Sequence, residues 1–281
     1  MKVGFIGQGW IGKNYANDFE ARGYAVTRYA LEEPYRANKA AIVQCDIVFI
    51  AVPTPTKPEG FDDSLVRDAL TLIGEGKIAV IKSTILPRKT EELQRAFPHL
   101  YVLHSPEFLV QSNAAHDAAH PERNIIGIPL ETREYREKAQ TVLDLLPRAP
   151  YERIMSARDA EFVKYAGNCF LFAKVMYMNI LFDLVKASGA DWEAVREAMI
   201  HDPRISESHT NPVHASGRGA GGGCFIKDFE AFRRLYEETV GDVLGLAVLN
   251  ALKEKNLGLL IESQKDLALI ESVYGGINIL E

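Results

Sequence analysis

The residues with the clearest chemical potential are a cysteine, the charged residues beside it and the glycines before it. The segment 217–228 reads GRGAGGGCFIKD, and its glycines let backbone amides close on a ligand and expose the thiol of Cys224. Arg218 and Lys227 would favour the thiolate, which is the nucleophilic form. Asp228 follows Cys224 by four residues and shares its face if the segment is helical. A thiol nucleophile with an adjacent general base fits covalent catalysis.

A second candidate lies in an apolar segment that reads KYAGN. Lys164 and Asn168 are four residues apart, so they share one face of a helix. A lysine in the middle of a helix is usually solvated, but the flanking residues here are strongly apolar, and a mostly buried helix is expected. A partly buried lysine beside an asparagine can stabilise an oxyanion. The spacing alone leaves both interpretations of Lys164 open.

A glycine fingerprint near the N-terminus points to a dinucleotide. The sequence GQGWIG (7–12) follows an expected strand (2–6) and opens an expected helix that runs to about residue 22. The glycines allow a tight turn and a close approach of the backbone to a pyrophosphate, and the helix start supplies amides. The cofactor-binding residues expected from this turn are Gly7, Gly9, Trp10, Ile11 and Gly12.

The second half of the fingerprint is imperfect. An acid that would hold the ribose hydroxyls is expected about 20 residues further on, at the end of the second strand. The sequence there reads RYAL (28–31), and the nearest acids are Glu32 and Glu33. NAD is therefore preferred. NADP is not excluded, because Arg28 is either a partner for a 2′-phosphate or a solvated surface arginine.

Three polar segments each follow an expected strand. They are AVPTPT (51–56), KST (82–84) and SPEFL (105–109). Proline, serine and threonine often simply end strands. The carboxyl ends of parallel strands, however, share the edge where ligands bind. Three such ends therefore favour a binding site. The cofactor-binding residues expected there are Val52, Pro53, Thr54, Ser83 and Thr84.

The elements that must position these residues alternate between strand and helix up to residue 150. Short apolar runs predict buried strands, and periodic segments predict helices. Strands that alternate with helices indicate an α/β fold with a Rossmann-like, doubly wound parallel sheet. The expected strands are 2–6, 24–29, 46–52, 78–81, 101–104 and 124–128, with helices at 64–74 and 89–97 among those between them.

The pattern becomes helical from residue 151. One long central helix is expected from 156 to about 189, then helices at 191–199, 229–240 and 242–260, with a glycine-rich loop at 217–223. We therefore expect an NAD-binding domain at 1–150 and an all-helical domain for dimerisation and catalysis at 151–281. The tail 273–281 is short and apolar, and either packs or frays.

The composition limits the class of protein. A chain of 281 residues that is 47% hydrophobic and 25% charged suits two globular domains. A net charge of −6 argues against a nucleic-acid partner. The first residues lack the layout of a signal peptide, and the apolar run 169–184 is interrupted by polar residues, so no membrane span is expected. The histidines of the 201–214 loop match no metal-site spacing, so no metal is expected. Cys45 and Cys169 are expected to be small buried hydrophobes, and three unpaired cysteines indicate the reducing cytoplasm.

Together these segments resemble the UDP-glucose/GDP-mannose 6-dehydrogenase family. The matching segments occur in family order and are GQGWIG, AVPTPTKPEGFDDSLV, KSTILPRKT, SPEFL, AEFVKYAGN and GAGGGCFIKD. The cysteine segment is the most specific, whereas the K-x-x-x-N helix is shared with 3-hydroxyacid dehydrogenases. The resemblance implies a two-step oxidation of a primary alcohol to a carboxylate with two NAD, and a homodimer built on the long helix.

The resemblance also implies roles for individual residues. Cys224 would attack the aldehyde to give a thiohemiacetal, and loss of hydride would give a thioester. Lys164 and Asn168 would stabilise the developing oxyanion. Asp228 would assist general-base steps with Thr84 and a water that the SPE glutamate helps to position. The implied catalytic residues are Cys224, Lys164, Asn168, Asp228, Thr84 and Glu107. The implied substrate-binding residues are Glu107, Phe108, Leu109, Lys164, Asn168, Arg218 and Gly221.

Three departures from the family pattern weaken the expectation for the substrate. The segment between the second strand and Asp46 is shorter than in family members, and Gln111 replaces an acid four residues after Glu107. The resemblance also implies a C-terminal domain that grips the nucleotide half of the substrate, and we expect this chain to work without it. The expected substrate is therefore either a sugar nucleotide, held by the central domain, a dimer mate or another chain, or a smaller related nucleotide or sugar phosphate.

Two other functions stay open. One is a two-electron dehydrogenase of the 3-hydroxyacid type, in which Lys164 is the general base and Cys224 is not required. The other is a catalytically silent NAD-binding subunit. The intact CFIKD and KYAGN segments argue against the silent subunit.

Overall fold

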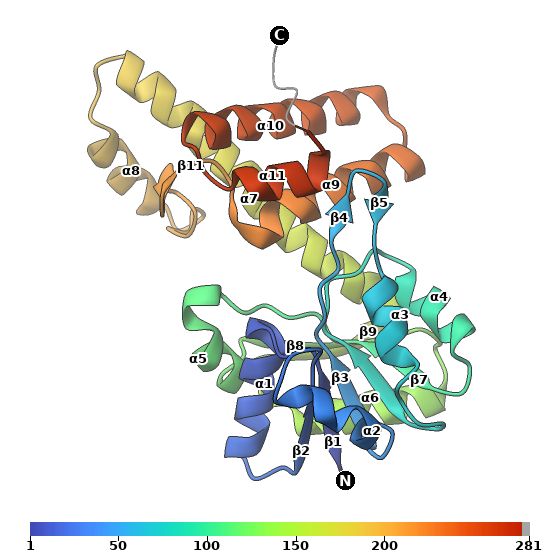
Figure 1. Ribbon diagram of the computed structural model, residues 1–281. Coiled ribbons are helices and arrows are strands. Elements are labelled where there is room, and N and C mark those ends of the chain that lie inside the picture. Colours follow the sequence, from blue (N-terminus) through green and yellow to red (C-terminus); the bar gives the residue numbers. More distant parts are fainter. Residues whose placement is uncertain (277–281) are drawn as a thin grey trace. The chain divides into compact units, whose positions relative to one another are not determined.

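The computed structural model describes residues 1–276, which form two compact units (Figure 1). The sheet unit contains Met1–Thr54 and Asp62–Lys164. The helical unit contains Pro55–Phe61 and the chain from Tyr165 onward. We had expected a division at residue 150. The units divide later because the first turns of the long helix pack on the sheet, where a Cβ on Gly127 would lie 2.8 Å from the Cα of Ala157.

The sheet unit is built on one seven-stranded sheet. Its strands, in spatial order, are β2 (Val26–Tyr29), β1 (Val3–Ile6), β3 (Ile47–Ile50), β6 (Ile78–Ile81), β7 (Tyr101–His104), β8 (Arg123–Ile128) and β9 (Tyr151–Ser156). The first five strands are parallel, as the alternation of strands and helices predicts. The α/β fold class is confirmed, with one departure: β8 runs antiparallel to β7 and then pairs in parallel with β9.

Helices cover both faces of this sheet. The helices α1 (Trp10–Ala21), α5 (Ala114–Ala119) and α6 (Arg133–Leu145) pack on the face that carries Phe5, Phe49 and Leu103. The helices α3 (Ser64–Leu70) and α4 (Lys89–Ala96) lie on the other face (Figure 1). Strands β1, β3 and β6 are buried along their whole length, which explains why their sequences are continuous apolar runs rather than alternating ones.

The strand order places a ligand-binding edge in the middle of the sheet. β1 lies between β2 and β3. The chain therefore adds β2 on one side of β1 and then crosses over to add β3 and β6 on the other side. Ligands of doubly wound sheets bind at the carboxyl ends of the strands on either side of such a reversal. The short connection from β2 to β3 holds only η1 (Tyr35–Asn38) and α2 (Lys39–Ile42).

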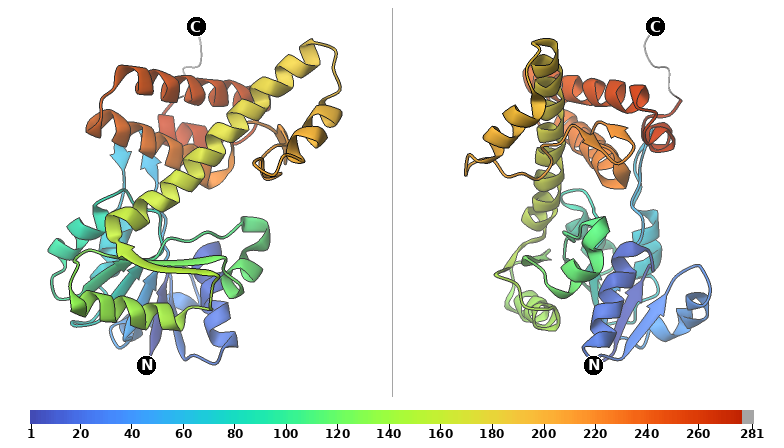
Figure 2. Two further views of the ribbon diagram at one scale, coloured as in Figure 1. Left: turned by 180° about the vertical axis from the view of Figure 1, so that it is seen from behind. Right: turned by 90° about the vertical axis from the view of Figure 1, so that its left-hand side faces the viewer.

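The helical unit is organised around α7 (Ala157–Ala187), whose later turns it contains. Figure 2 shows α9 (Gly222–Thr239), α10 (Val243–Glu262) and α11 (Leu267–Tyr274) gathered along one side of α7, with α8 (Trp192–Ile200) on another. Phe172 of α7 stacks on Phe229 of α9 with a centroid distance of 3.8 Å. The short hairpins are β4 (Thr56–Lys57) with β5 (Gly60–Phe61), and β10 (Val213–His214) with β11 (Gly217–Arg218).

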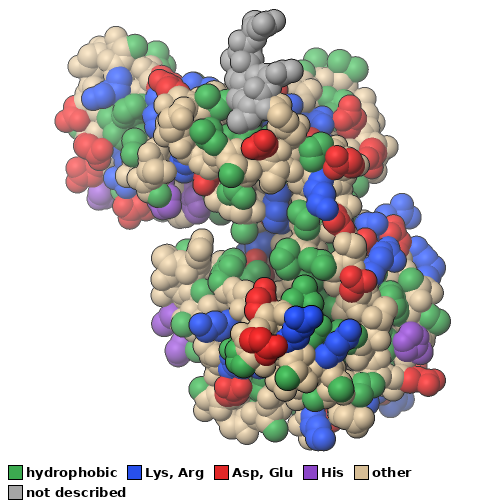
Figure 3. All heavy atoms as spheres, in the orientation of Figure 1, with side chains coloured by type: hydrophobic (Ala, Val, Ile, Leu, Met, Phe, Trp, Pro, Cys, Tyr) green, Lys and Arg blue, Asp and Glu red, His purple; other side chains and the backbone are tan. Residues whose placement is uncertain are grey.

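Two features of the chain's surface bear on its partners. By length and composition, α7 could cross a bilayer, but core helices of globular proteins meet the same criterion. On the visible face of each unit, Lys and Arg are interspersed with Asp and Glu and form no continuous basic surface (Figure 3). Among described residues this face therefore offers no stripe for a nucleic acid.

Candidate active site

The fingerprint turn has the shape that a dinucleotide needs. Gly7 has φ 91°, and a Cβ there would lie 2.2 Å from the carbonyl oxygen of Ala51. A Cβ on Gly12 would lie 2.0 Å from the carbonyl oxygen of Gly7. Both positions therefore require glycine to let β1, β3 and α1 approach one another.

The middle glycine of the turn, Gly9, is not required by contacts within the protein. Gly9 is the N-cap of α1, and a Cβ there would meet no protein atom within 4 Å. No side chain caps α1, and its first turn contains no acid, so the amides that start with Trp10 and Ile11 are left to an external anion. The turn therefore fits a pyrophosphate, which would occupy the space that a side chain on Gly9 would fill.

Two of the polar segments that follow strands lie side by side in the sheet unit. The amide of Val52 donates to Ser83 Oγ at 3.0 Å, and that hydroxyl donates back to the carbonyl of Val52 at 2.7 Å. Thr54 Oγ1 donates to the carbonyl oxygen of Thr84 at 2.6 Å. The segments around Pro53 and Thr84 thus form one hydrogen-bonded strip at the carboxyl ends of β3 and β6, as the parallel sheet predicts.

Arg28 is not free to bind a 2′-phosphate. Its guanidinium pairs with Glu20 of α1, with an Nη2–Oε2 distance of 2.7 Å and an Nε–Oε1 distance of 2.9 Å. The alternative of a solvated arginine is also wrong, because the Arg28 side chain is only 11% exposed. This pairing removes the feature that left NADP open.

The third polar segment carries a buried ion pair. Lys164 Nζ lies 2.6 Å from Glu107 Oε1 and also donates to the carbonyl oxygen of Glu107 at 2.9 Å. The other carboxylate oxygen accepts the amide of Leu109 at 2.9 Å. The side chains of Lys164 and Glu107 are 8% and 2% exposed. The solvated interpretation of Lys164 is thereby excluded. The residue after Glu107 is Phe108, and the Cζ atom of Arg123 lies 3.7 Å from the centre of its ring.

A second buried lysine, which the sequence did not single out, lies beside this pair. Lys82 Nζ donates to the carbonyl and the hydroxyl of Ser105 at 3.2 and 3.0 Å, and lies 4.3 Å from the centre of the Tyr15 ring. Burial lowers the pKa of Lys82 to about 7; the carboxylate of Glu107 opposes this shift and Lys164 adds to it. Its position at the end of β6 was visible in the sequence, but its burial was not.

Glu161 is another buried acid that the motifs did not reveal. Its carboxylate accepts the amide of Arg88 at 2.6 Å, the amide of Thr90 at 2.8 Å and the hydroxyl of Thr90 at 2.6 Å. Burial raises the pKa of Glu161 to about 7, and the hydrogen bonds from Thr90 and Arg88 act in the opposite direction. Glu161 thereby caps α4 from the first turns of α7.

Cys224 lies in the first turn of a helix, not in a loop. We expected the glycine-rich loop to extend to residue 223 and the helix to begin near 229, but α9 begins at Gly222. Its N-cap, Gly221, offers no side-chain acceptor. The half-buried thiol lies in the first turn of α9, and a helix N-terminus favours negative charge.

Asp228 occupies the place that the spacing predicts. It lies one turn after Cys224 on α9, is 1% exposed, and its Oδ2 accepts Asn168 Nδ2 at 2.6 Å. Lys227 forms an ion pair with its other oxygen. Asn168 and Asp228 are therefore held together, and Lys164 lies one turn before Asn168 on the same helix, α7.

Arg218 is engaged by side chains of α7. Its Nη2 pairs with Asp183 at 2.6 Å, its Nε donates to Asn179 Oδ1 at 2.8 Å, and its guanidinium lies 5.0 Å from the Phe182 ring centre. The guanidinium of Arg218 is thus held by Asp183 and Asn179 in the helical unit.

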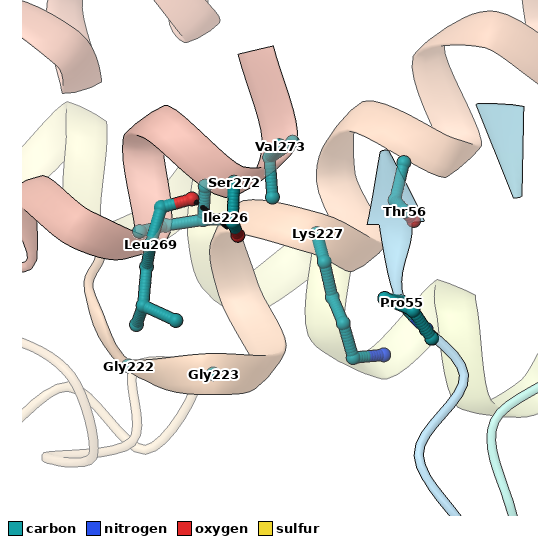
Figure 4. A pocket seen from close by; sticks show the side chains of 9 residues that line it. All are labelled: Pro55, Thr56, Gly222, Gly223, Ile226, Lys227, Leu269, Ser272 and Val273. Carbon is teal, nitrogen blue, oxygen red and sulfur yellow. Dashed lines mark hydrogen bonds between the residues drawn. The ribbon is translucent and has the colours of Figure 1, made fainter. Parts of the chain in front are cut away.

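A small pocket adjoins the start of α9 (Figure 4). It encloses about 110 Å³ between α9, α11 and the start of β4. Apolar side chains such as Ile226 and Val273 form most of its wall, and the Lys227 side chain extends along it (Figure 4). Gly222 and Gly223 line it as well, which connects it to the turn that carries Cys224.

Comparison with known proteins identifies both parts of the chain. The UDP-glucose/GDP-mannose dehydrogenase family matches with its NAD binding domain at residues 30–144 and its central domain at residues 158–256. A UDP-glucose 6-dehydrogenase of Pseudomonas aeruginosa is 32% identical over 241 residues, which are 80% of this chain and 52% of that protein. The chain spans about half the length of the first curated relatives it matches. The NAD binding domain confirms the expected cofactor.

Solved structures give the same result. A UDP-glucose dehydrogenase from Pyrobaculum islandicum has a TM-score of 0.78 at 27% identity, with 92% of this chain and 68% of that chain covered. A 3-hydroxyisobutyrate dehydrogenase from Mycobacterium tuberculosis shares the fold, with a TM-score of 0.72 at 16% identity and 97% and 98% coverage.

Proposed function

This chain belongs to the UDP-glucose/GDP-mannose dehydrogenase family, and we propose that it is an NAD-dependent dehydrogenase of a sugar nucleotide or a related nucleotide or sugar phosphate. The reaction is the oxidation of a primary alcohol to a carboxylate through a thioester on Cys224. The observation that carries the proposal is the start of α9. Cys224 lies among helix N-terminal amides, and Asp228, one turn later, is buried and held by Asn168. A two-electron alcohol dehydrogenase needs no such thiol.

The first oxidation converts the alcohol to an aldehyde. Bound NAD would supply the acceptor for the hydride of the alcohol carbon, and the hydroxyl proton would leave to solvent through a basic group. Gly9 and the uncapped start of α1 would hold the pyrophosphate, and the strip formed by Val52, Thr54 and Ser83 would face the cofactor. Lys164 and Asn168 would stabilise the negative charge that develops on the oxygen.

The second oxidation uses the cysteine. The thiolate of Cys224 adds to the aldehyde carbon and forms a C–S bond, and the thiohemiacetal loses a second hydride to give the thioester. Water then attacks the thioester carbon, the C–S bond breaks, and the thiolate is regenerated. Asp228, with Thr84, would assist the proton transfers, and Glu107 would orient the water. One alcohol, two NAD⁺ and one water give one carboxylate, two NADH and three protons.

The chemistry of the buried Glu107–Lys164 pair suits this scheme. Lys164 is held by both the carbonyl and the carboxylate of Glu107, so its ammonium is oriented before substrate binds. A preorganised cation in a buried site stabilises an oxyanion better than a mobile one, because it does not need to reorganise during the reaction.

We propose a homodimer in the cytoplasm as the working form. Along α7 of the helical unit, Phe170, Tyr177, Ile180 and Leu184 are 50–68% exposed. These positions recur at intervals of three, four and seven residues, so they share one face of the helix. An exposed apolar stripe of this kind indicates a protein–protein interface.

The ratio of NADH to product tests the reaction. Purified protein is incubated with NAD and a panel of sugar nucleotides, nucleotides and sugar phosphates. NADH is followed by absorbance, and the acid product is quantified by mass spectrometry. We expect two NADH for each carboxylate. One NADH for each oxidised product would instead support the 3-hydroxyacid-type reaction with Lys164 as base, and NAD binding with no turnover across the panel would support a silent subunit.

A further inference from the structure

The glycine-rich turn (217–222) that leads into α9 is held by side chains from far along the chain. The central one is Lys265, which is 6% exposed and follows the last turn of α10. Its Nζ donates to the carbonyl oxygens of His214, Gly217 and Gly219 at 3.1, 3.3 and 3.1 Å. A lysine ammonium has three N–H donors, so each of them has an acceptor on the chain that leads to α9.

Three neighbours of Lys265 bind the amides of the same turn. The amide of Arg218 donates to Ser263 Oγ at 2.9 Å, and the amide of Gly222 donates to Asp266 Oδ2 at 2.7 Å. Asn256 accepts the amide of Ala220 at 2.7 Å and donates to its carbonyl at 3.1 Å. We call the four side chains the loop clamp, and its members are Asn256, Ser263, Lys265 and Asp266.

The glycines of the turn fit the loop clamp closely. A Cβ on Gly221 would lie 2.1 Å from Asp266 Oδ2 and 2.8 Å from Lys265 Cε. A Cβ on Gly217 would lie 2.4 Å from the Cβ of Ser263. The sequence predicts that glycines here let backbone amides close on a ligand; in the structure, Gly217 and Gly221 make room for the side chains that hold the turn.

The backbone of the clamp is strained on both sides of Lys265. Gln264 and Asp266 have φ of 54° and 56°, a left-handed conformation that is costly for residues other than glycine. Such a conformation persists only where the surrounding contacts impose it, and it concentrates at functional sites. Here it directs the Lys265 and Asp266 side chains to the same turn.

We propose that Lys265 and Asp266 are positioning residues for Cys224, with Lys265 fixing the path of the glycine-rich turn and Asp266 setting the charge at the start of α9. Asp266 places its carboxylate on the first amide of α9, two residues before Cys224. The helix N-terminus stabilises the thiolate, and a negative charge at this amide offsets part of that stabilisation. The carboxylate of Asp266 is therefore expected to make the thiolate of Cys224 less favourable than it would be at the same helix start without this charge. Only the effect on turnover rests on the proposed function.

Alkylation of Cys224 tests the role of Asp266 without any substrate. The rate of carbamidomethylation by iodoacetamide is measured at one neutral pH, and mass spectrometry locates the modified cysteine. Asp266→Asn keeps an oxygen acceptor for the amide of Gly222 but removes the charge. We expect Cys224 to react about threefold faster or more in this variant.

The matched control is Asp242→Asn. Asp242 accepts the amide of Gly245 at the start of α10, so it has the same helix-capping chemistry in the same unit. Its substitution should leave the alkylation rate of Cys224 unchanged. An unchanged rate in Asp266→Asn, or an equal increase in both variants, would overturn the role of Asp266.

Steady-state kinetics test Lys265. We expect Lys265→Met to lower kcat more than tenfold while the KM for NAD stays within twofold, because the cofactor turn lies in the other unit. A parallel loss of kcat, NAD affinity and thermal stability would show that Lys265 is merely structural, and an unchanged kcat would also overturn its role. Absence of turnover in the wild type would refute the proposed function, while the alkylation result would still decide the role of Asp266.

Discussion

Each of the two units holds one side chain that is central to the proposed chemistry, Glu107 or Cys224, and the two side chains are held in different ways. Glu107 of the sheet unit follows the end of β7, is 2% exposed, and is fixed by contacts with Lys164 and Leu109. Cys224 of the helical unit is half-buried, lies at a helix start, and depends on the loop clamp for the path of the chain that precedes it.

The difference follows from what precedes each residue. The buried strand β7 pairs along its whole length with β6 and, at His104, with Gly127 of β8, so the segment that follows it starts from a defined position. A glycine-rich turn has no such ladder and needs side chains to supply its hydrogen bonds. The position after β7 therefore suits Glu107, which must stay oriented. The position after the clamped turn suits Cys224, a nucleophile that must react.

The largest expected effect is at the nucleophile. Cys224→Ser should lower kcat by more than about 10³-fold, because a hydroxyl at this position is a far weaker nucleophile than a thiolate. Turnover is measured as NADH formation, and a search for accumulated aldehyde by mass spectrometry follows. Cys45→Ala, in the core of the sheet unit, is the control and should keep wild-type kcat. Wild-type turnover in Cys224→Ser would refute the thioester route.

The next largest loss of turnover is expected at Glu107 in the sheet unit. Glu107→Gln should lower kcat about 10²-fold, because the neutral amide no longer holds Lys164 as an ion pair or helps to orient water. The KM for NAD should not change. Glu91→Gln is the matched control, since Glu91 pairs with Arg158 in the same unit. If both variants lost activity equally, the special role of Glu107 would be excluded.

Glu161 tests how far the sheet unit depends on contacts from α7. Glu161→Gln should lower the free energy of unfolding by about 1–3 kcal/mol, because an amide cannot accept all the hydrogen bonds from Arg88 and Thr90. Urea unfolding measures the change. Glu92→Gln on α4, which affects only a surface pair with Lys89, should change stability by less than about 0.5 kcal/mol. Equal stability of Glu161→Gln and wild type would contradict the capping role.

The smallest expected effect is a pH dependence at Lys82. Burial lowers the pKa of Lys82 to about 7 in the folded state, whereas an unfolded lysine keeps its proton to about pH 10.4. The unfolded chain therefore binds more protons at Lys82 between these pH values, so the contribution of Lys82 to the free energy of unfolding becomes more favourable to the folded state as pH rises from 7 toward 10.

Lys82→Met removes this titration. The free energy of unfolding of the wild type, relative to the variant, should rise by at least about 1 kcal/mol between pH 7 and pH 9, since one unit of pKa shift corresponds to about 1.4 kcal/mol. Lys77→Met, which removes a half-exposed lysine paired with Asp46, is the control and should show no such rise. A constant difference across this range would show that Lys82 is not a perturbed buried cation.

Most strands could be predicted from the sequence because a buried strand appears as a continuous run of apolar residues. The runs at Ile47–Ile50 and Ile78–Ile81 are apolar throughout, and both lie where expected. β9 was missed because Tyr151–Ser156 is a partly exposed edge strand that carries charged residues, and its pattern resembles a loop. The start of α9 was also placed too late, because Gly222 and Gly223 have poor helix propensity.

The sequence by itself determined the chemistry that is available. The spacing of Cys224 and Asp228, and that of Lys164 and Asn168, sets which groups share a helix face, because helical periodicity is a local property. The glycines of the fingerprint likewise specify a turn that a pyrophosphate can approach.

The tertiary structure alone decided how those groups are held. Burial of Lys82 and Glu161, the engagement of Arg28 by Glu20 and of Arg218 by Asp183, and the loop clamp all depend on contacts between distant segments. Lys265 binds carbonyls that precede it by 46 to 51 residues. Their meeting depends on how α9, α10 and α11 pack, since no local pattern in the sequence specifies which remote carbonyl a lysine will reach.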